Sequence, residues 1–413
     1  MQGRFISSLR IYTHSQVEIT ELIKTLAAKH LAEIIAIRRH LHSEPELSFK
    51  EFKTSEYVRH ILLEKVPGIT IRKAAGTGLI ACITGNGGSK VIALRADMDA
   101  LPISEQNDVS YKSKNQNIMH ACGHDVHMAS LLGTAMILGE IKEHWKGVVE
   151  LIFQPGEERL PGGASMMINE GALNDPAPEY IFAQHVFPPL EAGKTGFRKG
   201  AYMASCDEIY LTIGGKGGHA AMRGTYINPI LIASRVLLAL EEKFMLKPLN
   251  SIPTVLSFGN IQGNGATNVI PQEVKLEGTF RTMNEEWRNE AHRIINDTVC
   301  LIAGEMGGNC LVRIEKGYPA LVNDDKATGI ARHAAEIYLG KENVTDLEKS
   351  MTSEDFSFYS QVKPACFYRL GTGNKAKGIV SGVHTPTFNI DENALETGMG
   401  LMAYIAFSSL RES

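Results

Sequence analysis

The stretch Val91-Ile92-Ala93-Leu94-Arg95-Ala96, which runs into Asp97-Met98-Asp99, predicts the fold of this chain more directly than any other. A short, nearly continuous apolar run is typical of a strand that is buried on both faces of a parallel sheet. The two aspartates follow at its carboxyl end, which is the edge where open α/β sheets build their sites. We therefore expect an α/β domain whose functional residues gather at the ends of its strands.

The segments around this strand alternate between helical and strand patterns. Apolar spacing predicts an amphipathic helix from Val17 to His42 and another helix from Val126 to Ile141. Further strands are expected at Leu79 to Thr84, Val148 to Phe153 and Tyr180 to Gln184. Strands that alternate with helices favour a mostly parallel sheet.

The pattern changes after about residue 195. Helices are expected after Asn228-Pro229 and from Glu285, and strands at Glu208 to Ile213, Thr254 to Ile261, Glu273 to Arg281 and near Leu311. This order suggests a small α+β unit inserted into the larger domain. We predict a discontinuous metal-binding α/β domain of residues 1–195 and 318–413, with an inserted α+β domain of residues 196–317.

Length and composition limit the class of protein. A chain of 413 residues exceeds one ordinary core, which indicates two domains. The formal net charge of −4 provides no basic field for binding nucleic acid. Because no apolar run is long enough for a signal peptide or a membrane span, we expect a cytoplasmic protein with no membrane partner.

The segment His120-Ala121-Cys122-Gly123-His124-Asp125 places a cysteine and a histidine two residues apart at the start of a helical pattern. Thiolate and imidazole suit zinc or a similar divalent transition ion better than magnesium or calcium. The alternative is a buried thiol beside a hydrogen-bonded histidine. Two ligands do not hold a metal alone, so a metal site requires further donors from distant parts of the chain.

Such donors occur at predicted strand ends and in one late loop: Asp97, Asp99, Glu157, Glu158, His185 and His384. Together they can complete a two-metal site, which needs a bridging ligand, terminal ligands and a position for water. Glu158 can ligate while the adjacent Glu157 acts as general base. Taken singly, the glutamates can be a solvated turn, the histidines structural, and the aspartates helix caps.

A series of ordered motifs resembles a known family: Leu94-Arg95-Ala96-Asp97-Met98-Asp99-Ala100-Leu101-Pro102, the Cys122 and His124 pair with Asp125 and His127, Phe153-Gln154-Pro155-Gly156-Glu157-Glu158, His185, Gly218-His219-Ala220, Asn268-Val269-Ile270-Pro271, Gly278-Thr279-Phe280-Arg281, Ser353-Glu354-Asp355-Phe356 and His384-Thr385-Pro386. In these motifs the chain resembles the M20 metallopeptidase clan, subfamily D, of N-acyl-amino-acid amidohydrolases, which includes hippurate and auxin-conjugate hydrolases. The resemblance covers nearly the whole chain from about Arg38.

The resemblance implies a site with two divalent metal ions (zinc, manganese, nickel or cobalt), Glu157 as general base, and as metal ligands Cys122, His124, Glu158, His185 and His384. Cys122 is then the bridging thiolate. The wider clan has a His-x-Asp pair where this chain has Asp97-Met98-Asp99. Asp99 is therefore expected to orient a ligand, and His124 to replace the ligand that Asp97 does not provide. The role of Asp97 itself stays open.

By the same resemblance, the inserted domain is a lid and dimerisation domain, and the protein is a homodimer or a higher homo-oligomer. His219 is expected to donate a hydrogen bond to the developing oxyanion, either within its own chain or across a dimer. Asn268 and Arg281 are expected to hold the substrate carboxylate, because a guanidinium fork matches a carboxylate and preorganised donors stabilise tetrahedral charge. The alternative for Arg281 is a salt bridge on a strand face.

Two glycine-rich stretches superficially resemble nucleotide-binding loops. Gly214 to His219 lacks the Gly-Lys-Ser/Thr ending of a P-loop, and Gly76-Thr77-Gly78 is followed by a predicted strand where a dinucleotide fingerprint needs a helix. We expect neither to bind a nucleotide.

The sequence as a whole predicts a metal-dependent amidohydrolase that cleaves N-acyl-L-amino acids to a carboxylate and a free amino acid. A dipeptidase or small-peptide hydrolase with the same two-metal site is the first alternative. A non-catalytic binding protein that keeps the fold is the second, although every expected ligand position and the base are filled.

Overall fold

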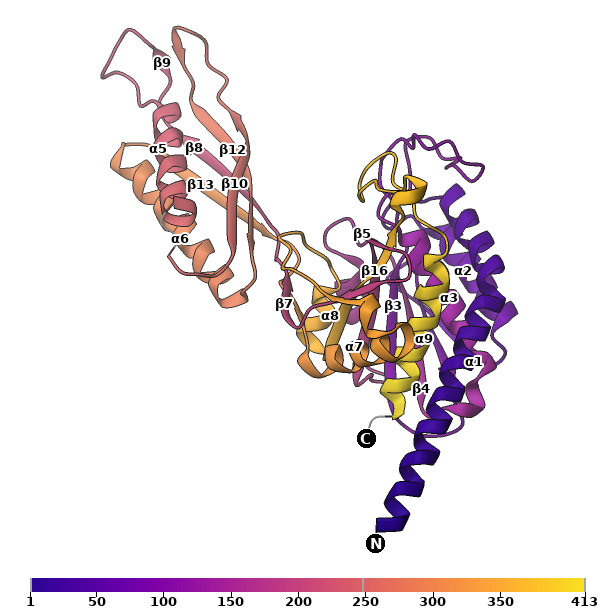
Figure 1. The fold of residues 1–413 in the computed structure, drawn as a ribbon. Helices are drawn as coiled ribbons and strands as arrows, with labels where there is room; N and C mark the ends of the chain where they lie inside the picture. Colours follow the sequence, from indigo (N-terminus) through magenta and orange to yellow (C-terminus); the bar gives the residue numbers. More distant parts are fainter. Residues whose placement is uncertain (1, 247–248, 412–413) are drawn as a thin grey trace. The chain divides into compact units, whose positions relative to one another are not determined.

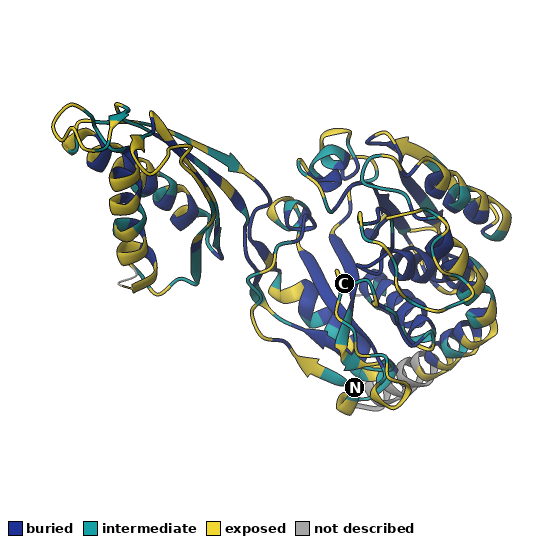
Figure 2. Cartoon of the chain, turned by 90° about the horizontal axis from the view of Figure 1, so that it is seen from above, coloured by how far each residue is buried: buried dark blue, intermediate teal, exposed yellow. Residues whose placement is uncertain are grey.

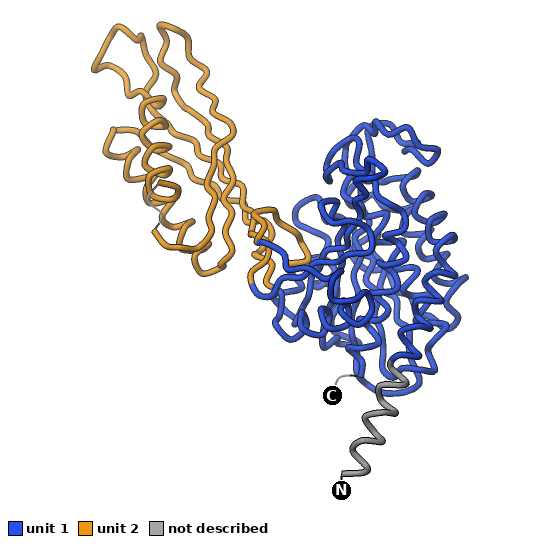
Figure 3. Tube along the Cα trace, viewed as in Figure 1, with its two compact units in different colours: residues 1–200, 323–348, 358–413 blue, residues 201–322, 349–357 orange. Residues whose placement is uncertain are grey.

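The computed structural model describes residues 2–246 and 249–411, with side chains from Val17 onward. The chain forms two compact units, which Figure 3 shows in different colours. Unit 1 comprises Met1–Gly200, Asn323–Glu348 and Phe358–Ser413, and unit 2 comprises Ala201–Val322 and Lys349–Ser357. The catalytic and lid roles that the sequence suggests for the two parts stay predictions.

Unit 1 is built on an eight-stranded sheet in the order β1-β2-β4-β3-β5-β16-β6-β15 (Figure 1). The central strands β4, β3, β5 and β16 run parallel to one another, and β1 and β2 add an antiparallel edge. The predicted α/β class with a mostly parallel sheet is thus confirmed. The strands are β1 (Thr70–Ala74), β2 (Gly78–Thr84), β3 (Val91–Asp97), β4 (Val148–Gln154), β5 (Tyr180–Glu191), β6 (Thr195–Phe197), β15 (Val344–Asp346) and β16 (Ala365–Gly373).

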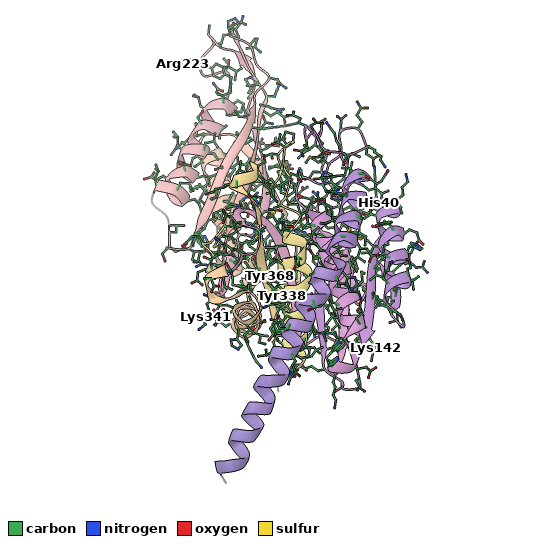
Figure 4. All side chains as sticks on the ribbon, turned by 45° about the vertical axis from the view of Figure 1, so that its right-hand side comes forward. His40, Lys142, Arg223, Tyr338, Lys341 and Tyr368 are labelled. Atoms are coloured by element: carbon green, nitrogen blue, oxygen red, sulfur yellow. The ribbon has the colours of Figure 1, made fainter. Side chains whose placement is uncertain are left out.

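Helices cover this sheet and supply most of the core of unit 1. α1, α3 and α9 pack against one another, and α3 and α9 also contact the sheet. Tyr338 of α7, labelled in Figure 4, stacks on Tyr404 of α9 with ring centroids 5.7 Å apart. Figure 2 shows the buried central strands. The helices are α1 (Gln2–Ser43), α2 (Phe52–Lys65), α3 (His124–Glu140), α4 (Gly163–Asn169), α7 (Asp325–Leu339), α8 (Ser357–Val362) and α9 (Ala394–Arg411).

Two boundaries near the predicted site differ from the sequence expectation. α3 begins at His124 and not at Val126, because Gly123 adopts a left-handed conformation (φ 81°) at the N-cap and turns the chain into the helix two residues earlier. β5 continues to Glu191, since β16 pairs alongside it as far as the Gly373–Glu191 pair. His185 therefore lies within a strand and not after its end.

The described residues of unit 2 form a four-stranded antiparallel sheet in the order β10-β12-β8-β13, together with the helices α5 (Pro229–Glu241) and α6 (Glu285–Glu305). The strands and helices predicted here are confirmed, and each predicted boundary lies within one residue of the observed one. The strands of unit 2 and its margins are β7 (Gly200–Met203), β8 (Asp207–Gly214), β9 (Gly218–His219), β10 (Thr254–Gln262), β11 (Val269–Ile270), β12 (Glu273–Thr282), β13 (Asn309–Lys316) and β14 (Leu321–Asn323).

The glycine-rich stretches do not open helices. Gly78 is the first residue of strand β2, and Gly218–His219 forms the short strand β9, which pairs with β11. Both arrangements agree with the expectation that neither stretch is a nucleotide-binding loop. Among the described helices, none combines the length and the apolar character needed to span a lipid bilayer.

Candidate metal centre

The five predicted ligands lie together in unit 1, near the carboxyl ends of β3 and β4: Cys122, His124, Glu158, His185 and His384. Cys122, His124 and His185 are buried, whereas 52% of the His384 side chain is exposed. They are positioned by the loop into α3, the loop after β4, strand β5 and a late loop between β16 and α9. The fold therefore assembles residues that are far apart in the sequence.

Two groups of possible ligand atoms share the Cys122 thiol. One group joins it to His124 and His185, the other joins it to Glu158 and His384, and the atoms of each group lie within 4.8 Å of one another. Cys122 Sγ is 3.5 Å from His185 Nε2 and 3.3 Å from His384 Nε2. His384 Nε2 is also 3.1 Å from Glu158 Oε1. A thiol common to two ligand groups has the placement that a bridging ligand requires.

Hydrogen bonds orient two of the histidines with one nitrogen toward these groups. His185 Nδ1 donates to the carbonyl of Val186 over 2.8 Å, which leaves Nε2 to face the thiol. His124 Nδ1 lies 3.2 Å from Asp99 Oδ1, while its buried Nε2 has no hydrogen-bond partner among the described residues. A buried nitrogen without a partner costs free energy, and a metal ion at that point would remove the cost. The residues thus fit a metal centre.

Asp97 is held by residues outside the predicted ligand set. Arg95 Nη1 donates to its Oδ2 and His127 Nδ1 to its Oδ1, each over 2.6 Å. His127 Nε2 in turn accepts from the N–H of Val186 over 2.9 Å. Asp97, His124 and His127 also form a possible ligand group by proximity. Because Asp97 and His127 already satisfy each other, we assign them a supporting position beside the centre.

Acidic side chains dominate the electrostatics around His124 and Cys122. Burial disfavours a charged imidazole, yet Asp97, Asp99 and Glu158 together raise the pKa of His124 to about 10. Burial raises the pKa of the Cys122 thiol well above its usual range, and Glu158 adds to the rise. Such a cluster of buried acids attracts a cation, and thiolate ligation releases a proton when a metal binds.

His185 has the opposite electrostatic environment. Burial lowers the pKa of its imidazole well below the usual range, and the nearby Arg369 lowers it further. The imidazole is therefore neutral at pH 7, which is the form in which histidine binds a metal.

Asp99 is a hydrogen-bond acceptor for several parts of the centre. In addition to His124, it accepts from the Ser48 hydroxyl over 2.6 Å and from the N–H groups of Glu157 and Glu158 over 3.1 and 3.0 Å. Glu157 itself is only 6% exposed. One carboxylate thus connects a predicted ligand histidine to the backbone of the predicted base.

The three other predicted site residues lie in unit 2. His219 of β9 pairs with Val269 of β11, next to Asn268, so these two predicted residues are brought together. Arg281 lies near the carboxyl end of β12, whereas Asn268 precedes its start. Arg281 Nη1 donates to the carbonyl of Met351 over 3.2 Å, and no carboxylate of the described residues pairs with it. Unit 2 therefore keeps Arg281 apart from His219.

The sequence did not indicate the polar residues that are hydrogen-bonded next to the predicted ligands. Arg38 Nε donates to Asp125 Oδ2 over 2.7 Å, and His42 Nδ1 contacts the same oxygen at 2.8 Å. Arg95 was recognised as part of a strand and of a family motif, but no role was predicted for it. The one available signal was the polar character of Arg38 and Arg95 inside otherwise apolar patterns.

The sequence profile of peptidase family M20/M25/M40 matches residues 93–408. The chain belongs to this family. Membership in a peptidase family makes it a hydrolase, in agreement with the resemblance found in the motifs. The predicted fold class is also that of solved family members.

Two relatives and one solved structure are similar to this chain over most of its length. The chain is 39% identical to N-acetyl-L-cysteine deacetylase of Bacillus subtilis over 88% of this chain and 85% of the relative. It is 38% identical to N-acyl-L-amino acid amidohydrolase of Geobacillus stearothermophilus over 76% and 83%. Among solved structures, the YXEP protein of Bacillus subtilis, described as a dinuclear metal-binding peptidase from the M20 family, has a TM-score of 0.81 and 34% identity, covering 93% of this chain and 99% of that one.

Proposed function

We propose that this protein is a metal-dependent amidohydrolase that cleaves N-acyl-L-amino acids into a carboxylate and a free amino acid. The observation that carries the proposal is the pair of ligand groups that share Cys122, with Glu157 beside them. The names of the two relatives above, a deacetylase and an amidohydrolase of N-acylated amino acids, support the substrate class. A solved relative described as dinuclear supports two metal ions.

In this proposal the metal ligands are Cys122, His124, Glu158, His185 and His384, with Cys122 as the bridge. Bound divalent ions would polarise the scissile carbonyl and make a water molecule more acidic at neutral pH. Thiolate ligation favours zinc, while manganese, nickel and cobalt remain candidates for the active form.

The proton transfers in the proposal belong to Glu157. Its carboxylate takes a proton from the attacking water and then delivers it to the leaving nitrogen, which departs as the amine of the free amino acid. Burial of Glu157 limits its access to bulk water, and Asp99 holds its backbone N–H in place. These features suit a base that has to stay in one position during both transfers.

In unit 2 we assign Arg281 and Asn268 to the substrate carboxylate and His219 to the oxyanion. Arg281 lies eight residues after Glu273, the first residue of β12, which is about 27 Å at the usual rise of a strand. His219 lies beyond the opposite end of β12, because it pairs with Val269, which precedes Glu273 in the chain. One small substrate does not span that length, so we propose that His219 and the adjacent Asn268 both act on the site of a partner subunit in a dimer.

The assembly that we propose is a homodimer formed through unit 2. Large apolar side chains are exposed there on α5, α6 and β13: Leu231 (59%), Leu238 (72%), Leu301 (63%) and Leu311 (66%). β13 is also an edge strand of its sheet. Exposed apolar side chains and unpaired edges are features of association surfaces.

Light scattering tests the dimer. The wild type should have twice the 45.2 kDa mass of the chain, and the double variant Leu238→Glu with Leu311→Lys should be a monomer. A monomeric wild type contradicts the proposal.

The test of the function is a turnover panel with controlled metal content. The protein is loaded separately with zinc, manganese, cobalt or nickel and assayed on N-acetyl-L-methionine, N-acetyl-L-cysteine and N-benzoylglycine, alongside unblocked dipeptides. We expect about two metal ions per chain and preferential hydrolysis of the acylated amino acids, which chelation abolishes. Faster hydrolysis of the dipeptides would support the peptidase alternative, and no turnover with metal bound would support a binding protein.

Substitution of the base completes this test. Glu157→Gln should lower kcat by about a hundredfold to ten-thousandfold, the range that general acid–base catalysis contributes. Glu143→Gln is the matched control, because Glu143 is exposed in a short helical turn of unit 1. Wild-type turnover by Glu157→Gln would refute the assigned mechanism. The cytoplasmic location expected from the sequence stays a prediction.

A further inference from the structure

Three consecutive backbone N–H groups around the proposed base donate to buried carboxylates. The N–H groups of Glu157 and Glu158 donate to the two oxygens of Asp99. The preceding N–H, that of Gly156, donates to Glu51 Oε1 over 2.8 Å. Asp99 belongs to the site already described. Glu51 lies 105 residues before Gly156 in the sequence and has no role in the proposed mechanism so far.

Glu51 is unusual for its position in the fold. It occupies the N-cap of α2, where a short polar side chain such as that of Asp, Asn, Ser or Thr ordinarily accepts a hydrogen bond from the first turn of the helix. The Glu51 side chain makes no such cap bond. Its Oε1 accepts from the N–H of Phe49 over 2.8 Å as well as from Gly156, and its Oε2 accepts from the Thr77 hydroxyl over 2.6 Å.

The burial of Glu51 also needs an explanation. The side chain is 0% exposed, and taking a carboxylate out of water is costly unless it is hydrogen-bonded. The pKa of Glu51 is raised, first by burial and also by the negative charge of Asp99. The chain thus places two carboxylates close together beside one short loop. The side-chain hydrogen bonds that Glu51 accepts from Gly156, Phe49 and Thr77 fix that loop and the segments beside it.

Gly156 is constrained from several directions. It has a φ of +55°, and a Cβ added to it would lie 2.2 Å from Cε1 of the Phe49 ring. Its carbonyl accepts from the N–H of Gly163 over 3.0 Å. The Glu51 bond holds the remaining polar group of this residue. A rotation of the Gly156 peptide would carry the adjacent Glu157 with it.

We propose that Glu51 is a positioning residue, whose carboxylate fixes the Gly156 peptide and thereby the placement of Glu157 and Glu158. This inference rests on the proposed function, in which Glu157 is the base and Glu158 a ligand. A displacement of about 1 Å at a reacting group can lower a rate about a hundredfold. Glu51 therefore affects the rate although it touches neither the substrate nor a metal ligand side chain.

The test uses two substitutions of Glu51, one that changes the length of the side chain and one that changes its charge. Glu51→Gln keeps the length of the side chain and an oxygen that accepts from Gly156, but removes the charge. Glu51→Asp keeps the charge but withdraws the carboxylate by one methylene, about 1.5 Å. Glu46→Asp is the matched control, because Glu46 accepts hydrogen bonds from the N–H and the hydroxyl of Thr54 in the first turn of α2.

For the N-acyl amino acid of the panel that the wild type hydrolyses fastest, Glu51→Asp should have a kcat about tenfold to a hundredfold lower, with KM and metal content changed less than about threefold. Glu51→Gln and Glu46→Asp should stay within about threefold of the wild type in both constants. Full kcat in Glu51→Asp overturns the proposal. So does a Glu51→Gln variant as slow as Glu51→Asp, because the charge and not the hydrogen bond would then matter.

Hydrogen–deuterium exchange provides a readout that needs no turnover. In the peptide that covers residues 154–159, Glu51→Asp should accelerate exchange of one amide at least about tenfold, and Glu51→Gln and Glu46→Asp should not. If the wild type hydrolyses nothing in the panel, the proposed function fails while this measurement still decides whether Glu51 holds Gly156. Unchanged exchange in Glu51→Asp overturns the positioning role independently of the substrate.

Discussion

Each unit contains a buried aspartate that is held by an arginine and a histidine four residues apart on one helix. In unit 1, Asp125 is held by Arg38 and His42 of α1, and in unit 2 Asp207 is held by Arg288 and His292 of α6. Residues four apart face the same side of a helix, so one carboxylate can accept from both. The same chemistry therefore ties a helix to its neighbour in both units.

The two clusters differ in what the aspartate is attached to. Asp207 is the first residue of strand β8 and also accepts from the N–H of Gly317 over 3.1 Å, so it connects α6 to the sheet. Asp125 directly follows His124 in the first turn of α3. A structural ion pair in unit 2 thus has a counterpart in unit 1 whose aspartate is the sequence neighbour of a proposed metal ligand. The difference predicts which variants change stability alone and which change the site as well.

Arg38→Met should have the largest effect. It leaves Asp125 buried without its main counter-charge, which should lower the free energy of unfolding by about 3–5 kcal/mol. Loss of the Arg38 bond also releases Asp125, which directly follows His124 in the first turn of α3. Because His124 is then held less firmly, metal affinity should fall by about tenfold to a hundredfold. Urea unfolding and competitive metal titration measure the two effects.

The neighbouring Arg39 supplies the control for Arg38. Arg39 pairs with Glu392 while 45% of its side chain is exposed, so Arg39→Met should cost less than about 1 kcal/mol and leave metal affinity unchanged. If Arg38→Met lost stability but kept wild-type metal affinity, both clusters would be purely structural, contrary to our expectation for unit 1.

Arg288→Met should have the next largest effect, and on stability alone. Asp207 keeps its bonds to His292 and to Gly317, so we expect a loss of about 3 kcal/mol in the free energy of unfolding, the lower end for a broken buried pair. Metal content and kcat should match the wild type. Arg293→Met, which removes an exposed charge from the same helix, is the control. A metal-binding defect in Arg288→Met would show that the unit 2 cluster is not purely structural.

Unlike Asp125 and Asp207, Glu150 is a buried carboxyl that no helix side chain of the described residues holds by a hydrogen bond. Neither of its oxygens has a hydrogen-bond partner among the described residues, and burial raises its pKa to about 8, with Arg72 opposing the rise. The folded protein then retains a proton that the unfolded chain releases near pH 4.5. Stability from this group is present below that pH, decreases as the pH rises to about 8 and is constant above it.

The measurement for Glu150 is the unfolding free energy of Glu150→Gln relative to the wild type between pH 5 and pH 9. The difference should move in favour of the variant by up to about 1.4 kcal/mol per pH unit, and level off near pH 8. A difference that does not depend on pH would mean that the carboxyl is solvated or paired in solution.

Much of the fold and of the candidate site was predictable, because both correspond to local patterns in the amino-acid sequence. Apolar periodicity located the helix that became α1, and a continuous apolar run located the strand β3. Predicted strand ends and one late loop supplied the donors that the fold collects around Cys122. The end of β5 was not predictable, because Pro188 and Pro189 suggest that a strand stops, while pairing with β16 continues it to Glu191.

The supporting contacts were not predictable for a different reason. Arg38 meets Asp125 across 87 residues, and Glu51 meets Gly156 across 105, and no periodicity links such pairs. A buried arginine or glutamate in a single sequence looks like an ordinary surface residue of a helix or a loop. Only the packing of α1 against α3, and of the segment before α2 against the loop after β4, creates these bonds.

Asn284→Ala should have the smallest effect and tests how the unit 2 cluster is held. Asn284 caps α6, its side chain accepting from the N–H of Trp287 over 2.7 Å, one turn before Arg288. Loss of an N-cap typically costs about 1 kcal/mol, less than the loss of Arg288 itself. Asn296→Ala, an exposed position within the same helix, is the control. Thermal unfolding should show the loss with kcat unchanged; a loss as large as that of Arg288→Met would mean that the cap, and not the ion pair, is what holds α6 against Asp207.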